Sequence, residues 1–362
     1  REKGIKSLTH IKYDKVISEE KESENFNNIF KSINNYDAIF LHYITPMICL
    51  KLNENLKNKK IKIFVMFWGG EIFDLPGVIE DYLGNESKLI NKKLCPKKKL
   101  NFAFKPRNLI LEIKHFYKDK FVLKEIRKTY KRANYFCHFL NEDFKQISKL
   151  FPNKAKFIDF NYGNVESFVG GNIDPSFNHN SSDILIGNSG SITNNHIEIF
   201  NILNEIEIGK RKLFTPLSYS IYPSAKYLEL VLEKGEKLFD ENFKPILNFL
   251  EKDEYNKIYN SVEYVFMNHF RSQAMGNIYI ALYTGKKLFM SKKSTIFQQL
   301  NNYGCLLFAI EDIPKNKIDV FKKLSIEEKK RNRSIILKYF GKKKINEKYT
   351  KLCNELKKKQ VI

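Results

Sequence analysis

The sequence predicts an α/β protein of two domains, each built around a parallel β-sheet. Short apolar runs alternate with longer segments whose apolar residues recur at helical spacing, which is the pattern of βαβ units. The chain has 362 residues, of which 43% are hydrophobic, so two domains can each bury a core of ordinary size. A polar, turn-forming stretch at 170–182 is the expected boundary between them.

The first domain is expected at 1–175, with strands at 38–43, 61–67, 135–140 and 156–160. The run at 61–67 is almost continuously apolar, as expected of a parallel strand that is covered on both faces. The second domain is expected at 183–335, with strands at 183–187, 212–216, 246–250, 264–268, 287–290 and 306–310. Its expected helices are 193–206, 224–238, 253–261, 275–284 and 295–303, and a basic helix follows at 336–362.

The net charge of +22 is concentrated in two parts of the chain. Residues 86–132 contain sixteen Lys and Arg against four Asp and Glu, and basic residues dominate again at 315–359. Nucleic acid and an anionic membrane surface are the usual partners of such charge; a solvated, lysine-rich surface is the third interpretation. Apolar residues interleave with the basic ones at 83–132, which fits both a membrane-interface segment and an ordinary amphipathic helix pair.

Several classes of protein are disfavoured by what the sequence lacks. There is no run of eighteen apolar residues that would span a membrane, and no signal peptide. The five cysteines form no CxxC pair, so we expect reduced thiols. The chain starts at Arg1 without Met, and we expect an N-terminal piece to precede it.

Four polar stretches follow predicted strands, at 68–71, 188–196, 216–223 and 268–277. The carboxyl ends of parallel strands meet at one edge of a sheet, where α/β proteins bind their ligands. The stretch at 188–196 is predicted to be a tight turn that enters a helix, which suits an anion. An ordinary βα loop with nothing bound is the alternative interpretation of that turn.

The stretch at 268–277 offers the groups that a diphosphate needs. Arg271 supplies a charge, Gln273 a hydrogen-bond donor, and Gly276 a close backbone approach at a helix start. Neither a GxxxxGK[ST] loop nor a GxGxxG fingerprint is present, so this is no standard nucleotide-binding motif.

Trp68 and Glu71 lie at the end of the apolar strand of the first domain. A lone Trp is most often a core residue, but beside two glycines at a strand end Trp68 can instead be a platform for a sugar. Glu71 is either a general base or an acid in the first turn of a helix. His196 and Glu198 point to different sides of a helix and are poor joint metal ligands, so metal-dependent chemistry is not supported.

Four segments together resemble glycosyltransferase family 56, the 4-acetamido-4,6-dideoxygalactose (4-α-L-fucosyl-) transferases of enterobacterial common antigen synthesis. The segments are FWGGEIFD (67–74), GNSGSITNNHIE (187–198), PLSYSIYP (216–223) and RSQAMGN (271–277). The resemblance is strongest over 183–313. The family has Trp-Gly-Ala-Asp where this chain has Trp68-Gly69-Gly70-Glu71. The last residue is therefore still acidic, but its side chain is one methylene longer.

The resemblance implies a GT-B glycosyltransferase, with two Rossmann-like domains facing a cleft. It implies a dTDP-sugar donor, a polyprenyl-diphosphate-linked saccharide acceptor, no metal or other cofactor, and peripheral attachment to the anionic cytoplasmic face of the bacterial inner membrane. Glu71 would be catalytic and Trp68 would bind substrate. The diphosphate would be held by Arg271, Gln273, Gly276 and Asn277. The donor side would be lined by Asn188, Ser189, Asn194 and His196, with Tyr219 and Tyr222 near the nucleotide or the sugar.

Three rival functions remain open. A nucleic-acid-binding protein would explain the charge, although the basic residues lie outside the predicted cleft motifs. Another nucleotide-sugar enzyme, such as an epimerase, would need a dinucleotide fingerprint, which is missing. A glycosyltransferase that uses a different nucleotide sugar fits the same motifs.

Overall fold

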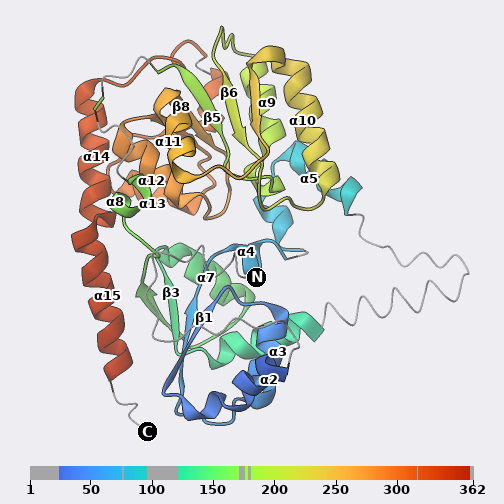
Figure 1. The fold of residues 1–362 in the computed structure, drawn as a ribbon, viewed down its shortest axis with the longest axis vertical. Helices are drawn as coiled ribbons and strands as arrows, with labels where there is room; N and C mark the ends of the chain where they lie inside the picture. Colours follow the sequence, from blue (N-terminus) through green and yellow to red (C-terminus); the bar gives the residue numbers. More distant parts are fainter. Residues whose placement is uncertain are drawn as a thin grey trace, which may run out of the picture.

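A computed structural model describes residues 24–75, 77–95, 121–170, 176–177, 181–315 and 317–358. Two parallel sheets stand one above the other (Figure 1). The first has strand order β1-β2-β3-β4 and the second has order β10-β9-β8-β5-β6-β7, with every pair parallel. The predicted α/β fold with parallel sheets is therefore confirmed.

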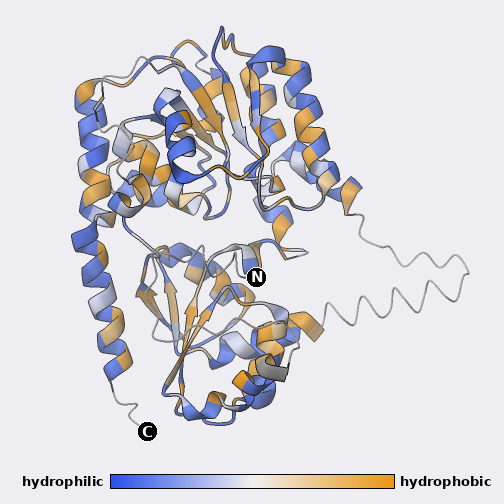
Figure 2. Ribbon diagram, in the orientation of Figure 1, coloured by the Kyte–Doolittle hydropathy of each residue, from blue (hydrophilic) through white to orange (hydrophobic). Residues whose placement is uncertain are grey.

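The strands of the first sheet are β1 Ala38–His42, β2 Lys62–Met66, β3 Tyr135–His138 and β4 Lys156–Asp159. Those of the second are β5 Asp183–Ile186, β6 Leu213–Pro216, β7 Phe243–Ile246, β8 Val262–Met267, β9 Lys287–Met290 and β10 Phe308–Ala309. All five residues of β2 and all six of β8 are buried, as two-sided coverage of a parallel sheet requires. Figure 2 shows this apolar character along the strands of both sheets.

The helices of the first half are α2 Glu24–Lys31, α3 Pro46–Asn55, α4 Gly70–Phe73, α5 Asn85–Leu94, α7 Asn141–Leu150 and α8 Val165–Val169. Those of the second half are α9 His196–Asn204, α10 Ala225–Phe239, α11 Lys252–Ser261, α12 Met275–Thr284, α13 Thr295–Asn302, α14 Ile326–Phe340 and α15 Lys342–Lys357. Short 3₁₀ turns occupy Ile33–Asn35, Ile79–Tyr82, Ile192–Asn194, Asp240–Asn242 and Ile310–Lys315.

Three expected elements differ from the structure. The basic helix expected at 336–362 is instead the end of α14, which begins at Ile326, followed after Gly341 by α15 Lys342–Lys357. The strand expected at 246–250 is wrong, because β7 ends at Ile246, where its pairing with β6 stops. Phe249, which looks like part of that strand, is 78% exposed. The helix expected at 193–206 begins three residues later. A 3₁₀ turn comes first, and Asn195 then takes a left-handed conformation with φ 51° before α9 starts.

The segment 79–94 precedes the predicted boundary but packs against the second sheet's helices. Ile79 and Leu83 belong to the hydrophobic cluster built around β5, β6 and α9. The Glu198 carboxylate in α9 accepts two hydrogen bonds, from the N–H and the hydroxyl of Ser87, each 2.8 Å long. The expected domain 1–175 is therefore divided in space, with α5 lying on the second domain. Residues 96–120, the centre of the basic segment, lie outside the described residues.

Helix α15 returns the chain from the second domain to the first (Figure 1). α14 packs on α12, Gly341 separates the two helices, and α15 then lies beside β3 and β4. The buried Lys62 Nζ of β2 donates to the terminal carbonyls of α15, at Glu355 (2.9 Å) and Leu356 (2.8 Å). A cation at this position stabilises the negative end of the helix dipole. Among the described residues, no helix has the length and apolar character needed to cross a membrane.

Candidate functional site

A cavity of about 370 Å³ lies between the two sheets, at the carboxyl ends of their strands. Six of the residues singled out from the sequence line it: Trp68, Asn188, Tyr219, Arg271, Gln273 and Gly276. The first domain contributes a further set, with rings predominating: Phe67, His138, Phe139, Phe160, Asn161 and Tyr162. The expected strand-end site is thus assembled from both domains.

Helix α12 presents its first turn to this cavity. Ala274, Met275 and Gly276 all line the cavity, and Ala274 takes a left-handed conformation with φ 61° immediately before the helix begins. No acidic residue lies in the first turn. The unpaired N–H groups and the positive end of the helix dipole therefore face a space that an anion could occupy.

Uncharged polar side chains surround that helix start. The Gln273 amide donates to Asn188 Oδ1 (2.9 Å) and accepts from the Thr193 hydroxyl (2.9 Å). The Asn188 amide in turn donates to the Tyr219 hydroxyl (2.8 Å). These bonds join the loops after β5, β6 and β8, so the polar groups on this side of the cavity have fixed positions.

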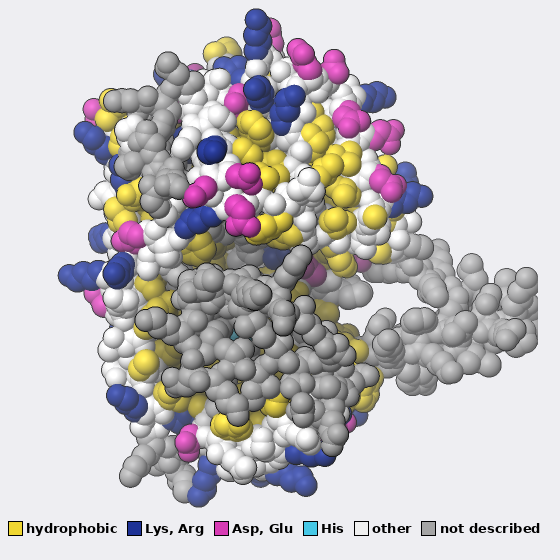
Figure 3. Space-filling view, in the orientation of Figure 1, with side chains coloured by type: hydrophobic (Ala, Val, Ile, Leu, Met, Phe, Trp, Pro, Cys, Tyr) yellow, Lys and Arg dark blue, Asp and Glu magenta, His cyan; other side chains and the backbone are white. Residues whose placement is uncertain are grey.

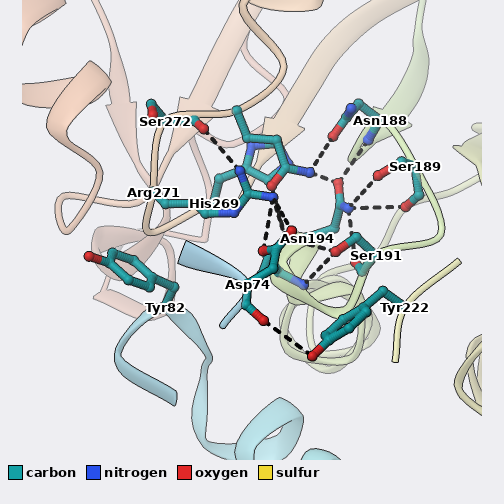
Figure 4. A network of polar contacts seen from close by, with 12 residues as sticks. Asp74, Tyr82, Asn188, Ser189, Ser191, Asn194, Tyr222, His269, Arg271 and Ser272 are labelled. Atoms are coloured by element: carbon teal, nitrogen blue, oxygen red, sulfur yellow. Dashed lines mark hydrogen bonds and ion pairs between the residues drawn. The ribbon is translucent and has the colours of Figure 1, made fainter. Parts of the chain in front are cut away.

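Asn194 and Ser189 shape the turn after β5 and do not line the cavity. The Asn194 carbonyl oxygen accepts from the Asn188 N–H (2.9 Å), and His269 Nε2 lies 2.8 Å from the same oxygen. Its amide donates to the backbone oxygens of Ser189 and Ser191. Figure 4 shows this network converging on Asn194. The Asn194 side chain, which was expected to line the donor side of the cleft, therefore stabilises the turn that places Asn188 in the cavity wall.

His196, Asn277 and Tyr222 also lie outside the cavity lining, contrary to expectation. His196 is fully buried, with Nδ1 3.0 Å from the Tyr227 hydroxyl, and burial lowers its pKa to about 3. The left-handed Asn195 turns the chain so that this first residue of α9 enters the core. Asn277 accepts from the Tyr255 hydroxyl (3.2 Å), and the Tyr222 hydroxyl donates to the backbone oxygen of Asp74 (3.3 Å).

Arg271 bridges the two domains. One guanidinium nitrogen lies 3.3 Å from Asp74 Oδ1 of the first domain and 3.4 Å from the Thr193 hydroxyl, and the other donates to the Ser272 carbonyl. Burial raises the pKa of Asp74, and the neighbouring Arg271 charge opposes that rise. Asp74 was missed from the sequence, although it lies one helical turn beyond Glu71 in FWGGEIFD.

Glu71 and Trp68 have opposite environments. Glu71 is buried and does not line the cavity; its Oε1 accepts from the Trp68 N–H (2.9 Å), closing the turn at Gly69, where φ is 101°. Burial raises the Glu71 pKa to about 7. Trp68 is 51% exposed, and its ring centroid lies 4.2 Å from that of Tyr162. The lone tryptophan is thus a surface ring beside the cavity, not a core residue.

Sequence reasoning missed a buried His–Asp pair in the first-domain wall. His138 ends β3 and lines the cavity, with Nε2 3.0 Å from Asp143 Oδ2. The available signal was a His within a predicted strand followed five residues later by an acid. Within the described ranges, no group of three or more His, Cys, Asp or Glu side chains could hold a metal ion.

Comparisons with known proteins fit this geometry. Residues 169–342 match the family model described as 4-alpha-L-fucosyltransferase glycosyl transferase group 56, as the sequence motifs suggested. Among solved structures, trehalose-6-phosphate synthase OtsA is similar, with a TM-score of 0.58 and 11% identity over 93% of this chain and 76% of that chain. A glycosyltransferase from Rickettsia africae gives 0.54 and 12%, over 94% and 84%.

The sucrose-phosphate synthase of Thermosynechococcus elongatus is a third similar structure. Its TM-score is 0.55 at 11% identity, over 91% of this chain and 77% of that chain. At such low identity these likenesses establish the fold alone. That fold is GT-B, with two parallel-sheet domains on either side of a cleft, which confirms the expected fold class.

Proposed function

Because the chain is a GT-B glycosyltransferase whose residues 169–342 match the group 56 family model, we propose that it transfers a deoxyamino sugar of the 4-acetamido-4,6-dideoxygalactose type. The donor is a dTDP-sugar and the acceptor is a polyprenyl-diphosphate-linked saccharide, in the assembly of a bacterial surface polysaccharide. The observation that carries this proposal is the interdomain cavity, which has a helix start and amides on one side and aromatic rings on the other.

The donor's diphosphate is assigned to the start of α12. The helix N–H groups and Arg271 supply the positive potential that a diphosphate leaving group needs. Arg271 already contacts Asp74, so the diphosphate competes with this carboxylate for the guanidinium. Since the helix start and Arg271 can together neutralise the leaving group, the proposed transfer needs no metal ion.

The acceptor saccharide is assigned to the first-domain side. Trp68 and Tyr162 present exposed rings next to one another, and aromatic faces combine a large apolar area with a polar edge, which suits the apolar faces of sugar rings. An acceptor that rests on these rings meets the donor across the cavity.

Peripheral attachment to the anionic inner-membrane face is part of the proposal because a lipid-linked acceptor lies in the bilayer. The support is the basic composition of 86–132, since each Lys or Arg near an anionic surface contributes roughly 1 kcal/mol. Lys97, Lys98, Lys99, Lys105 and Arg107 belong to this segment but lie outside the described residues. Replacing these five with Ser should abolish co-sedimentation with anionic liposomes; unchanged co-sedimentation would refute the assignment.

A thermal-shift comparison of dTDP, UDP, GDP and CMP tests the donor assignment. A ligand that binds the folded chain raises its melting temperature according to its affinity and concentration. We expect dTDP to give the largest shift at equal concentration, and dTDP-sugar to be consumed when lipid-linked saccharide is added. Equal shifts for all four nucleotides would remove the donor assignment.

A further inference from the structure

His138 is a titratable side chain in the cavity wall with one ring nitrogen already engaged. It is the last residue of β3, its Nε2 lies 3.0 Å from Asp143 Oδ2, and its ring lines the cavity. The ring is packed edge-on against Phe67, with centroids 5.1 Å apart at 83°, and lies 4.5 Å from Phe139. These contacts fix the plane of the imidazole.

Asp143 is placed to hold His138 in one tautomer. It lies in the first turn of α7 and is 1% exposed, so the helix dipole stabilises its negative charge. Its second oxygen accepts a 2.8 Å hydrogen bond from the Thr295 hydroxyl of the second domain. A carboxylate can only accept hydrogen bonds, so Nε2 of His138 carries the proton that it donates. The lone pair is then on Nδ1.

No carboxylate competes with His138 at the described cavity wall. The described residues that line the cavity include no Asp or Glu. Tyr162 and Tyr219 line it, but burial raises the pKa of both hydroxyls. Glu71, which the sequence suggested as catalytic, does not line the cavity, and its carboxylate accepts a hydrogen bond from the Trp68 N–H.

We propose that His138 is the general base of the transfer reaction and that Asp143 is its positioning residue, an inference that rests on the function proposed above for the same site. His138 lies on the acceptor side of the cavity, in the same wall as Trp68, and the start of α12 lies in the wall contributed by the second domain. A hydroxyl of the acceptor saccharide is the group that this nitrogen would deprotonate.

The step is a direct displacement at the anomeric carbon. The acceptor oxygen forms the new bond to that carbon as the bond from the carbon to the diphosphate oxygen breaks. The electron pair of the broken bond leaves with the nucleoside diphosphate, and the hydroxyl proton passes to Nδ1 of His138. The imidazolium returns this proton to solvent after the products leave. Attack opposite the leaving group inverts the anomeric configuration.

His138→Gln is the central test, because Gln can still hydrogen-bond Asp143 but cannot take up a proton near neutral pH. We expect kcat to fall by about 10²–10⁴-fold, the usual contribution of a general base, while the dTDP thermal shift is unchanged. Asp143→Asn should lower kcat with little change in the KM for acceptor. Lys145→Gln, at an exposed position on the same helix, is the matched control and should turn over like the parent.

Three results would overturn the assignment. The first is a His138→Gln variant that binds dTDP and keeps kcat within about threefold of the parent. Such a decrease is much smaller than the loss of a general base causes. The second is an Asp143→Asn variant that retains full kcat. The third is a product whose anomeric configuration, determined by NMR, is retained. This measurement uses the parent enzyme, so it does not depend on whether the variants fold. By contrast, a parent that neither binds dTDP nor transfers sugar contradicts the proposed function itself.

Discussion

The two walls of the cavity come from different domains and differ in chemistry. The wall of the second domain contains amides, an arginine, two tyrosines and a helix start, and hydrogen bonds between loops join its amides to Tyr219 and Thr193. The wall of the first domain is made of aromatic rings, with His138 among them. On the face shown in Figure 3, the visible Lys and Arg of the described residues are dispersed over both domains.

This difference separates two kinds of recognition. A diphosphate needs hydrogen-bond donors and positive potential in fixed places, which the second domain offers. A saccharide acceptor needs apolar faces and a group that takes up its hydroxyl proton, which the first domain offers. We therefore expect the second-domain wall to determine the affinity for dTDP and the first-domain wall to determine the KM for acceptor. Single substitutions in each wall test this division.

The largest effect is expected from Glu71, which supports the Trp68 turn of the first wall. Its pKa rises from 4.5 to about 7 in the folded chain, so the folded chain holds a proton that the unfolded chain has released. The contribution of Glu71 to stability is therefore fully present below pH 4.5 and is lost as pH rises through about 7. Glu71→Gln removes this loss, which amounts to about 3 kcal/mol at 1.36 kcal/mol per pKa unit.

Urea denaturation of the parent and of Glu71→Gln at pH 5 and pH 8 measures this effect. The free energy of unfolding of the variant minus that of the parent should be larger at pH 8 than at pH 5. A difference in unfolding free energy that is the same at both pH values would show that Glu71 does not titrate in this range.

The next largest effect concerns Arg271, which belongs to the second wall but touches the first domain. Arg271→Ala should weaken dTDP binding by about 1.5–3 kcal/mol, the scale of a charge-assisted hydrogen bond to an anion. Asp74→Asn is the matched control: it leaves the guanidinium in place and removes its competitor, so dTDP should bind at least as tightly. If calorimetry finds unchanged affinity in Arg271→Ala, this residue serves only to join the domains.

The smallest effect is expected from Trp68 in the first wall. Trp68→Ala should raise the KM for acceptor by roughly fivefold, about 1 kcal/mol, which is the scale of one aromatic contact. The dTDP affinity should be unchanged. Tyr36→Ala, which removes an exposed ring (53% exposed) outside the cavity lining, is the control. A weaker dTDP affinity in Trp68→Ala would contradict the division between the two walls.

The strands and the loops that follow them were predictable because their signals are local. Apolar runs such as Lys62–Met66 are buried on both faces, and the carboxyl ends of parallel strands must share an edge. That geometry brings Asn188 and Gln273 to one edge of the second sheet and Trp68 to the corresponding edge of the first. The strand expected at 246–250 was wrong because Phe249 belongs to a short apolar run, which is typical of a strand. The run continues past Ile246, where strand pairing stops.

The orientation of individual side chains was not predictable in the same way. His196 enters the core because Asn195 adopts a left-handed conformation, which the sequence pattern does not announce. Asp74–Arg271 and His138–Asp143–Thr295 each join elements far apart in the chain. Such contacts depend on how the two sheets are placed relative to one another, and no periodic pattern encodes that placement.

Helices α14 and α15 run along one side of both domains (Figure 1). Apart from the passage of 79–94 onto the second domain, the chain crosses between the domains after β4 and again at Gly341. These two crossings are bonded to each other: Lys348 donates to Asn161 Oδ1 (2.7 Å), and the Tyr349 hydroxyl donates to the Asn161 carbonyl (2.9 Å). Lys62 also holds the far end of α15 through its terminal carbonyls. The domains are therefore held together along this side of the molecule. We expect any separation of the two domains to break the contact between Arg271 and Asp74 before it disturbs the contacts of α15.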